Sequence, residues 1–167
     1  MQSVADKYSP PRLKAQLLRD PVHFLALGFG SGLSPKAPGT FGTLAAIPIY
    51  LLLDQLSLLI YLGITVLLFL AGIVICDGSA KKLGVHDHPG IVWDEVVGFL
   101  VTMTAAPGGV YWVLIGFVLF RLFDILKPWP IRAIDRGVAG GLGIMLDDLL
   151  AGVMAALVLQ LGAWWLH

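Results

Sequence analysis

The sequence predicts an all-α protein, a polytopic helical bundle in a membrane with about five hydrophobic segments and a basic amphipathic N-terminal stretch. Of its 167 residues, 57% are hydrophobic and only 13% are charged, whereas a soluble domain carries about a quarter charged residues. The mean hydropathy of +0.86 agrees with this composition. A soluble domain of this size leaves roughly a third of its unfolded surface exposed to water after folding. This chain is too apolar for that, so the bilayer is the expected solvent.

The N-terminal stretch, residues 1–21, carries four basic side chains and no continuous apolar core. This pattern is a poor signal peptide and favours a segment that lies along the membrane interface. We expect Leu13, Leu17 and Leu18 to face lipid. The rest of the sequence contains no internal repeat and no segment of clearly different composition, so residues 1–167 are expected to form a single domain.

Five segments are apolar enough to be membrane elements: 41–53, 56–76, 91–106, 110–123 and 144–166. A helix that crosses the hydrocarbon core needs about 20 apolar residues. Segment 56–76 is long and uncharged and is therefore the strongest candidate. Segment 41–53 is short and contains Pro48, so the sequence leaves open a short span or a re-entrant arm.

The charged residues between these segments are distributed unequally. With the N-terminus inside, five crossings place one set of basic residues in cytoplasmic segments: Lys36, Lys81, Lys82, Lys127, Arg132 and Arg136. The two external turns, residues 54–55 and 106–109, contain neither Lys nor Arg, as short external loops usually do. Asp54 is the one acid assigned outside. The remaining acids near the segments lie at their inner ends, which locates the expected chemistry at the cytoplasmic face.

Five of these acids form the candidate catalytic and metal-binding set: Asp94, Glu95, Asp124, Asp147 and Asp148. Asp94 and Glu95 are expected in the first turn of the third segment, where a helix N-terminus favours anions. Asp147 and Asp148 are expected near the start of the last segment. Asp124 precedes Lys127 by three residues, a spacing that places both on one helix face if the helix continues that far.

Carboxylates that converge in one small region raise one another's pKa or recruit a cation. An all-oxygen set suits Mg²⁺, with Mn²⁺ as a substitute, and Lys127 beside it can neutralise a phosphate. The simpler alternative is that these acids are ordinary helix-end charges facing water, with Asp124 and Lys127 as a structural ion pair.

Residues 34–43 (SPKAPGTFGT) are a second candidate, for substrate binding through Lys36, Thr40 and Thr43. Glycine amides and threonine hydroxyls at a helix start can bind phosphate, although a tight turn and close helix packing explain the same residues. His86 and His88 fit a surface turn better than a metal site, while Asp87 is close enough in sequence to join the edge of the site.

Four ordered motifs resemble the phosphatidylglycerophosphatase A family: residues 34–43, 91–98 (IVWDEVVG), 120–131 (FRLFDILKPWPI) and 141–152 (GLGIMLDDLLAG). The resemblance covers the chain from about residue 22. It implies Mg²⁺-dependent hydrolysis of phosphatidylglycerophosphate to phosphatidylglycerol and inorganic phosphate, in the bacterial inner membrane. It also implies functional roles for the residues of these motifs that are named above. The sequence leaves open whether water or an aspartate attacks phosphorus.

Other function classes fit less well. An ion-coupled transporter would use the acids as cation sites, but would place them near the membrane midplane. A lipid phosphatase with a histidine nucleophile needs a histidine motif that is absent, and a CDP-alcohol phosphotransferase motif is only hinted at near Asp77. The balanced charge of eleven basic and eleven acidic residues gives no indication of a nucleic-acid partner. The expected partners are the lipid substrate and membrane lipids, and the oligomeric state stays open.

Overall fold

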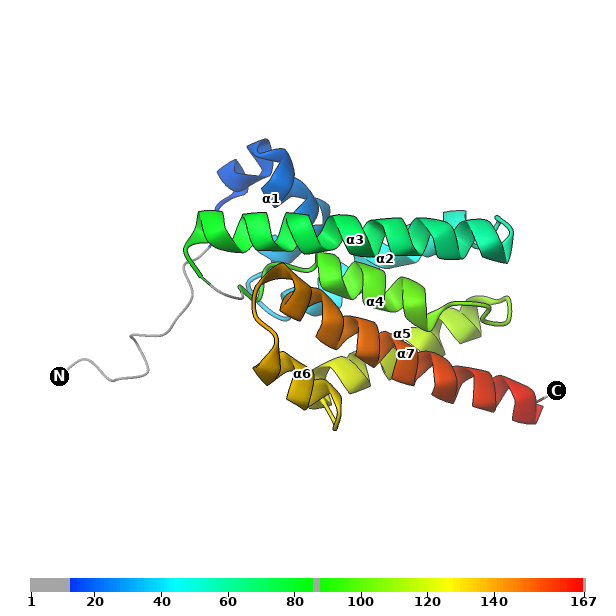
Figure 1. Ribbon diagram of the computed structural model, residues 1–167. Helices are drawn as coiled ribbons and strands as arrows, with labels where there is room; N and C mark the ends of the chain where they lie inside the picture. Colours follow the sequence, from blue (N-terminus) through cyan, green and yellow to red (C-terminus); the bar gives the residue numbers. More distant parts are fainter. Residues whose placement is uncertain (1–12, 86–87, 167) are drawn as a thin grey trace.

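The computed structural model describes residues 13–85 and 88–166, and this part of the chain contains helices and loops but no strand. The all-α prediction is therefore confirmed. The elements follow in the order η2 (Ala15–Arg19), α1 (Pro21–Ala26), η3 (Gly28–Leu33), α2 (Pro38–Leu53), α3 (Leu58–Leu83), α4 (Trp93–Thr102), α5 (Val110–Leu126), α6 (Ile131–Gly137) and α7 (Gly140–Leu166), where η is a 3₁₀ helix. Figure 1 shows α3 and α7 as the two long helices of the bundle, with α4 between them.

The N-terminal elements are attached to the C-terminal end of α3. Asp20 caps α1 by accepting a hydrogen bond from the Val22 amide at 2.9 Å, which satisfies one of the unpaired donors of the first turn. The other oxygen of Asp20 lies 2.5 Å from Lys82 Nζ at the end of α3. Buried His23 lies 2.9 Å from Ser79 Oγ on the same helix. These contacts join α1 to one end of the bundle.

The predicted amphipathic N-terminal stretch forms only a short helix in its described part. Residues 1–12 lie outside the described residues, and η2 contains only five residues. Leu13, Leu17 and Leu18 are half-buried, so part of each side chain is covered by the protein. Leu18 packs over Gly30 of η3, because the chain turns back at α1 and covers this end of the bundle.

All five predicted hydrophobic segments contain helices, but within residues 13–85 and 88–166 only two helices are long and apolar enough to cross a membrane: Leu58–Leu83 and Gly140–Leu166. The other segments fall short because a helix rises only about 1.5 Å per residue. The 10 residues of α4 therefore extend about 15 Å, half the thickness of a hydrocarbon core. Helix α2 has 16 residues and α5 has 17, so their lengths come closer to the thickness of the hydrocarbon core.

Helix α4 is held in the bundle by a glycine crossing with α7. A Cβ atom added to Gly98 would lie 2.8 Å from Asp148 O, and one added to Gly152 would lie 2.5 Å from Gly98 O. The two backbones are therefore in direct contact. Beyond the crossing, the buried side chains Phe99, Leu100 and Leu159 continue the same core. The crossing fixes the first turn of α4 beside the second and third turns of α7.

The chain between α5 and α7 also departs from the prediction. Helix α5 ends at Leu126, Lys127 adopts the left-handed conformation with φ 41°, and Pro128 follows. A short helix, α6, then forms where a loop was expected. Helix α7 begins at Gly140, earlier than residue 144, because a glycine with φ 75° allows the sharp entry. Asp147 and Asp148 consequently lie about two turns inside α7.

Candidate active site

The predicted catalytic residues lie around one cavity of ≈ 350 Å³ at the N-terminal ends of α2 and α4. Its lining includes five carboxylates and two basic side chains: Asp94, Glu95, Asp124, Asp147, Asp148, Arg121 and Lys127. The remaining lining comes from Ala37, Pro38, Gly39, Pro89, Ile91 and Ile125. We refer to this space as the carboxylate cavity. All six residues predicted to be catalytic are part of its wall.

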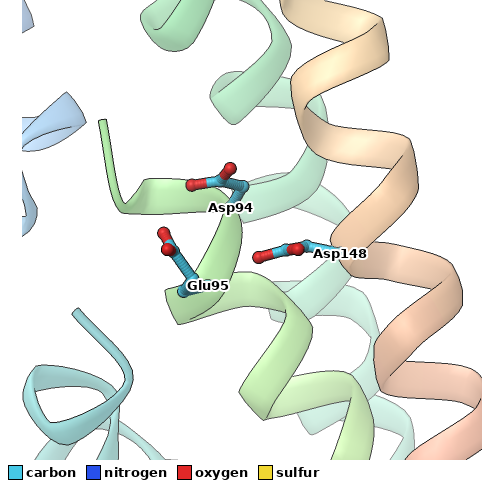
Figure 2. A group of neighbouring side chains, drawn as sticks. All are labelled: Asp94, Glu95 and Asp148. Carbon is cyan, nitrogen blue, oxygen red and sulfur yellow. The ribbon is translucent and has the colours of Figure 1, made fainter. Parts of the chain in front are cut away.

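Three of the carboxylates form the centre of the site. Oxygen atoms of Asp94, Glu95 and Asp148 all lie within 4.8 Å of one another, and we call this group the three-carboxylate cluster. Figure 2 shows Asp94 and Glu95 projecting from the first turn of α4, with Asp148 directed towards them from α7. Residues separated by more than fifty positions meet because of the glycine crossing between α4 and α7.

The cluster is buried and rich in acceptors. Asp148 is only 3% exposed, and the side chain of Glu95 is 13% exposed. Glu95 Oε2 and Asp148 Oδ2 are buried, and no donor among the described residues satisfies them. Buried carboxylates without donors are costly unless a cation or a proton compensates them.

The cluster fits a divalent cation of the hard class. Its potential ligands are all carboxylate oxygens, as Mg²⁺ and Mn²⁺ prefer, and it includes no cysteine or histidine of the kind that zinc favours. The orphaned oxygens of Glu95 and Asp148 are the observation that supports this fit, because a bound cation satisfies both.

Arg121 is a member of the site that the sequence analysis did not select. It forms an ion pair with Asp124, three residues later on α5, and its Nη1 lies 3.7 Å from Glu95 Oε1. Its side chain is only 14% exposed. The sequence could have indicated Arg121, because a charged residue within an apolar helix is costly to bury and is usually functional. Its spacing of three residues from Asp124 also predicts a shared helix face.

Lys127 connects α5, α6 and α7. Its Nζ lies 2.5 Å from Asp147 Oδ2 and 2.7 Å from Asp135 Oδ1. Burial by itself lowers the pKa of Lys127, but the hydrogen bonds to Asp135 and Asp147 raise that pKa well above its ordinary value. The ammonium group therefore stays protonated at neutral pH and acts as a fixed positive charge.

Two details of the predicted arrangement are corrected here. Lys127 does not pair with Asp124, because the chain leaves the helix at Leu126 and redirects the lysine to Asp135 and Asp147. Asp147 is not in the first turn of α7, so its charge is balanced by Lys127 and not by the helix terminus, whose influence fades beyond one turn.

The predicted substrate-binding residues are placed differently. Thr43 is fully buried and its hydroxyl donates to Gly39 O at 2.9 Å, within its own helix. Lys36 is exposed, and neither it nor Thr40 belongs to the cavity wall. The same stretch nevertheless reaches the site through Gly39, since a Cβ there would overlap Glu95 Oε1. The backbone at the start of α2, and not these side chains, faces the cavity.

The histidine turn does not contribute ligands from its described part. His88 is buried, and its Nδ1 accepts a hydrogen bond from the Gly90 amide at 3.0 Å. His86 and Asp87 lie outside the described residues.

The comparisons with known proteins agree on one family. Residues 24–163 match the family model described as phosphatidylglycerophosphatase A. The chain is 49% identical over 150 residues to phosphatidylglycerophosphatase A of Escherichia coli (strain K12), covering 89% of this chain and 87% of that protein. It is 46% identical over 156 residues to the protein of the same name from Haemophilus influenzae, covering 92% and 96%.

A more distant relative carries a different name. The chain is 37% identical over 147 residues to the "Putative phosphatidylinositol-3-phosphatase" of Bacteroides thetaiotaomicron, covering 84% of this chain and 92% of that protein. No solved structure matches the chain.

Proposed function

Because the chain belongs to the phosphatidylglycerophosphatase A family, we propose that it hydrolyses the phosphate monoester of phosphatidylglycerophosphate to phosphatidylglycerol and inorganic phosphate. The observation that carries this proposal is the three-carboxylate cluster, which shares one cavity with Arg121 and Lys127. A metal site beside two fixed positive charges is the arrangement that phosphoryl transfer needs.

Asp94, Glu95 and Asp148 are the proposed ligands of Mg²⁺, for which Mn²⁺ can substitute. When bound there, the ion supplies Lewis-acid polarisation of a phosphoryl oxygen and activation of a water molecule. The charge balance of the cavity supports this assignment, because its five carboxylates exceed its two basic side chains. A dianionic phosphate would be repelled from the cavity without a compensating cation.

The other charged residues position the substrate phosphate and stabilise the charge that develops on it. Arg121 presents a planar group of donors suited to phosphate oxygens, and Asp124 holds that group in place. Lys127 contributes a point charge, and Asp147 and Asp135 fix its ammonium group. The start of α2 adds backbone at Gly39, where the absence of a side chain allows close approach to the cavity.

The membrane arrangement is part of the same proposal. The five segments α2, α3, α4, α5 and α7 lie in the bacterial inner membrane, with the carboxylate cavity open to the cytoplasm. The exposed apolar side chains of α3 support a lipid-facing surface: Leu59 is 81% exposed, Leu67 66% and Val74 73%. Short α4 lies between longer helices, so that little of it needs to face lipid.

The end of the bundle that carries the site also carries basic residues. Lys82 lies in the last turn of α3, Lys127 caps the end of α5 and Arg132 lies in the first turn of α6, whereas the turn between α2 and α3 lies at the opposite end in Figure 1. This distribution supports a cytoplasmic location for the site. The ion-coupled transporter considered from the sequence gains no support, since Asp94 and Glu95 occupy the first turn of α4.

The decisive measurement is phosphate release from phosphatidylglycerophosphate by the purified, detergent-solubilised protein. We expect release that depends on added Mg²⁺ or Mn²⁺, that stops on treatment with EDTA, and that returns when the metal is restored. Full activity in a rigorously metal-free preparation contradicts the metal assignment, and absence of activity with either ion contradicts the function. Phosphatidylinositol 3-phosphate is the comparison substrate, because one relative is named for it, and a preference for it would reassign the substrate.

A further inference from the structure

A second cavity lies next to the carboxylate cavity, between the end of α5 and α6. It measures ≈ 320 Å³ and is lined by Lys127, Pro128, Trp129, Arg132 and Ala133. We call it the α5–α6 cavity. The two cavities share Lys127 as a wall residue, so a molecule that extends past this lysine can enter both.

The two cavities differ in the charged side chains that line them. The α5–α6 cavity is lined by two basic side chains and no carboxylate, whereas the carboxylate cavity contains five carboxylates. Arg132 donates a 3.5 Å hydrogen bond to Leu126 O, and no acid in the described part of the chain forms an ion pair with it. Its guanidinium therefore keeps donors for an anion that needs no metal ion.

The surroundings of the two cavities are apolar and exposed. Trp129 is 83% exposed and lines the α5–α6 cavity, and Ile125 is 66% exposed and lines the carboxylate cavity. Leu126, between them in sequence, is 58% exposed. An exposed tryptophan beside aliphatic side chains is typical of the boundary between lipid and water. A ligand in the α5–α6 cavity is therefore placed where its apolar part can stay in the lipid.

The proposed substrate carries two phosphates of different kinds. Its terminal phosphate is a monoester, which is dianionic and is cleaved. Its other phosphate is a diester, which carries one negative charge and joins the head-group glycerol to the diacylglycerol. The carboxylate cavity with a metal ion suits the monoester, and the guanidinium of Arg132, which needs no metal ion, suits the diester.

We propose that the α5–α6 cavity binds the phosphodiester of the lipid, with Arg132 as its specific contact and Lys127 between the two phosphates. This inference rests on the proposed function for the identity of the ligand. Arg132 is then a residue that determines substrate specificity, because it distinguishes a lipid with a diester beside the monoester from a simple phosphate monoester.

Binding measurements test the proposal without relying on turnover. The probes are dihexanoyl phosphatidylglycerol, which has the diester alone, inorganic phosphate with Mg²⁺, which resembles the monoester, and dihexanoylglycerol, which has neither. Isothermal titration calorimetry is carried out on the full chain in a non-ionic detergent. We expect Arg132→Gln to weaken dihexanoyl phosphatidylglycerol binding by about tenfold or more, the value of a lost charge-assisted hydrogen bond. Binding of inorganic phosphate should change by less than about twofold.

Two further variants control this experiment. Arg132→Lys should keep an intermediate affinity for dihexanoyl phosphatidylglycerol, because the charge remains but the fork of donors is lost. Lys81→Gln removes an exposed basic side chain from the end of α3 and should leave binding unchanged, which excludes a general attraction to anionic lipid.

Equal effects of Arg132→Gln on both phosphate-containing probes, or no effect on either, overturn the proposal. Wild-type affinity for dihexanoyl phosphatidylglycerol no greater than for dihexanoylglycerol also overturns it. Selective loss of diester binding in a protein that releases no phosphate contradicts only the proposed function.

Discussion

At the scale of single residues, the role of each charged side chain depends on its partner. Arg121 is held by Asp124 and lies near Glu95, and Lys127 is held by Asp135 and Asp147. Asp148 has an oxygen that no donor in the described chain satisfies. The acids of the site therefore divide into two groups. Asp124 and Asp147 hold basic side chains, and the three-carboxylate cluster is available to a cation.

We predict that Asp94→Asn, Glu95→Gln and Asp148→Asn each lower phosphate release by about a hundredfold or more, since loss of a group at the reacting centre costs about 3 kcal/mol. The same variants should weaken Mn²⁺ binding, measured by electron paramagnetic resonance on folded protein. Asp54→Asn, at an exposed position outside the site, should change neither quantity. Near-normal turnover and Mn²⁺ affinity in two of the three variants would refute the shared metal site.

Asp135 is not a neutral control for these variants. From the sequence alone, Asp135 is expected in a loop with basic residues nearby. Its replacement is then expected to change activity as little as replacement of Asp54. In the structure Asp135 lies 2.7 Å from Lys127 Nζ, so its removal releases one of the two groups that fix this lysine. An intermediate loss of activity is therefore expected from Asp135→Asn.

At the scale of elements, the position of the site depends on how closely α4 approaches α7. Gly98 and Gly152 bring the two backbones into contact, because neither position has space for a Cβ atom. Small residues at helix crossings of membrane proteins allow this kind of approach. Asp148, four residues before Gly152, is thereby brought beside the first turn of α4.

The crossing predicts opposite outcomes for two glycines of the same helix. Gly152→Ala places a methyl group 2.5 Å from Gly98 O and should destabilise the protein by about 1–3 kcal/mol, with a lower midpoint of thermal unfolding in detergent. It should also lower turnover by moving Asp148 away from Glu95. Gly162→Ala meets no atom within 4 Å and should leave stability unchanged or raise it by up to about 1 kcal/mol. Equal behaviour of the two variants would argue against a packed crossing.

At the scale of the whole molecule, the charged end and the apolar length of the bundle define an orientation. Figure 1 places the end of α3, α6 and the start of α7 at one end, and the turn between α2 and α3 at the other. Trp164 and Trp165, both highly exposed, lie near the end of α7 at this second end. They are suited to the opposite membrane interface.

Cysteine labelling tests this orientation in intact cells and in inverted membrane vesicles. Single cysteines at Lys82 and Arg132, in a variant without Cys76, should react with an impermeant reagent only from the cytoplasmic side. A cysteine at Gln55 should react only from the outside. Labelling of the Lys82 and Arg132 positions from opposite sides would contradict the five-segment arrangement.

The sequence by itself determined the helical class, the positions of the apolar helices and the acids that line the site. These features are local: an apolar run specifies a buried or lipid-facing helix, and Asp94 and Glu95 identify the start of α4. The same local signals led to five candidate membrane segments, with 56–76 as the strongest. In the part of the chain that the structure describes, two helices have the length and apolarity to span a membrane. The sequence did not show this, because a residue count along an apolar run does not reveal where a helix ends.

Only the tertiary structure decided which charges meet. Lys127 follows Asp124 by three residues, yet it contacts Asp135 and Asp147 because the chain leaves α5 at Leu126. Thr43 bonds to its own helix and not to the cavity, and Arg121 joins the site through elements distant in sequence. The sequence specifies which groups are costly to bury. The positions of helix ends and glycine crossings determine the partners of these groups, because they bring residues that are distant in sequence within a few ångströms of one another.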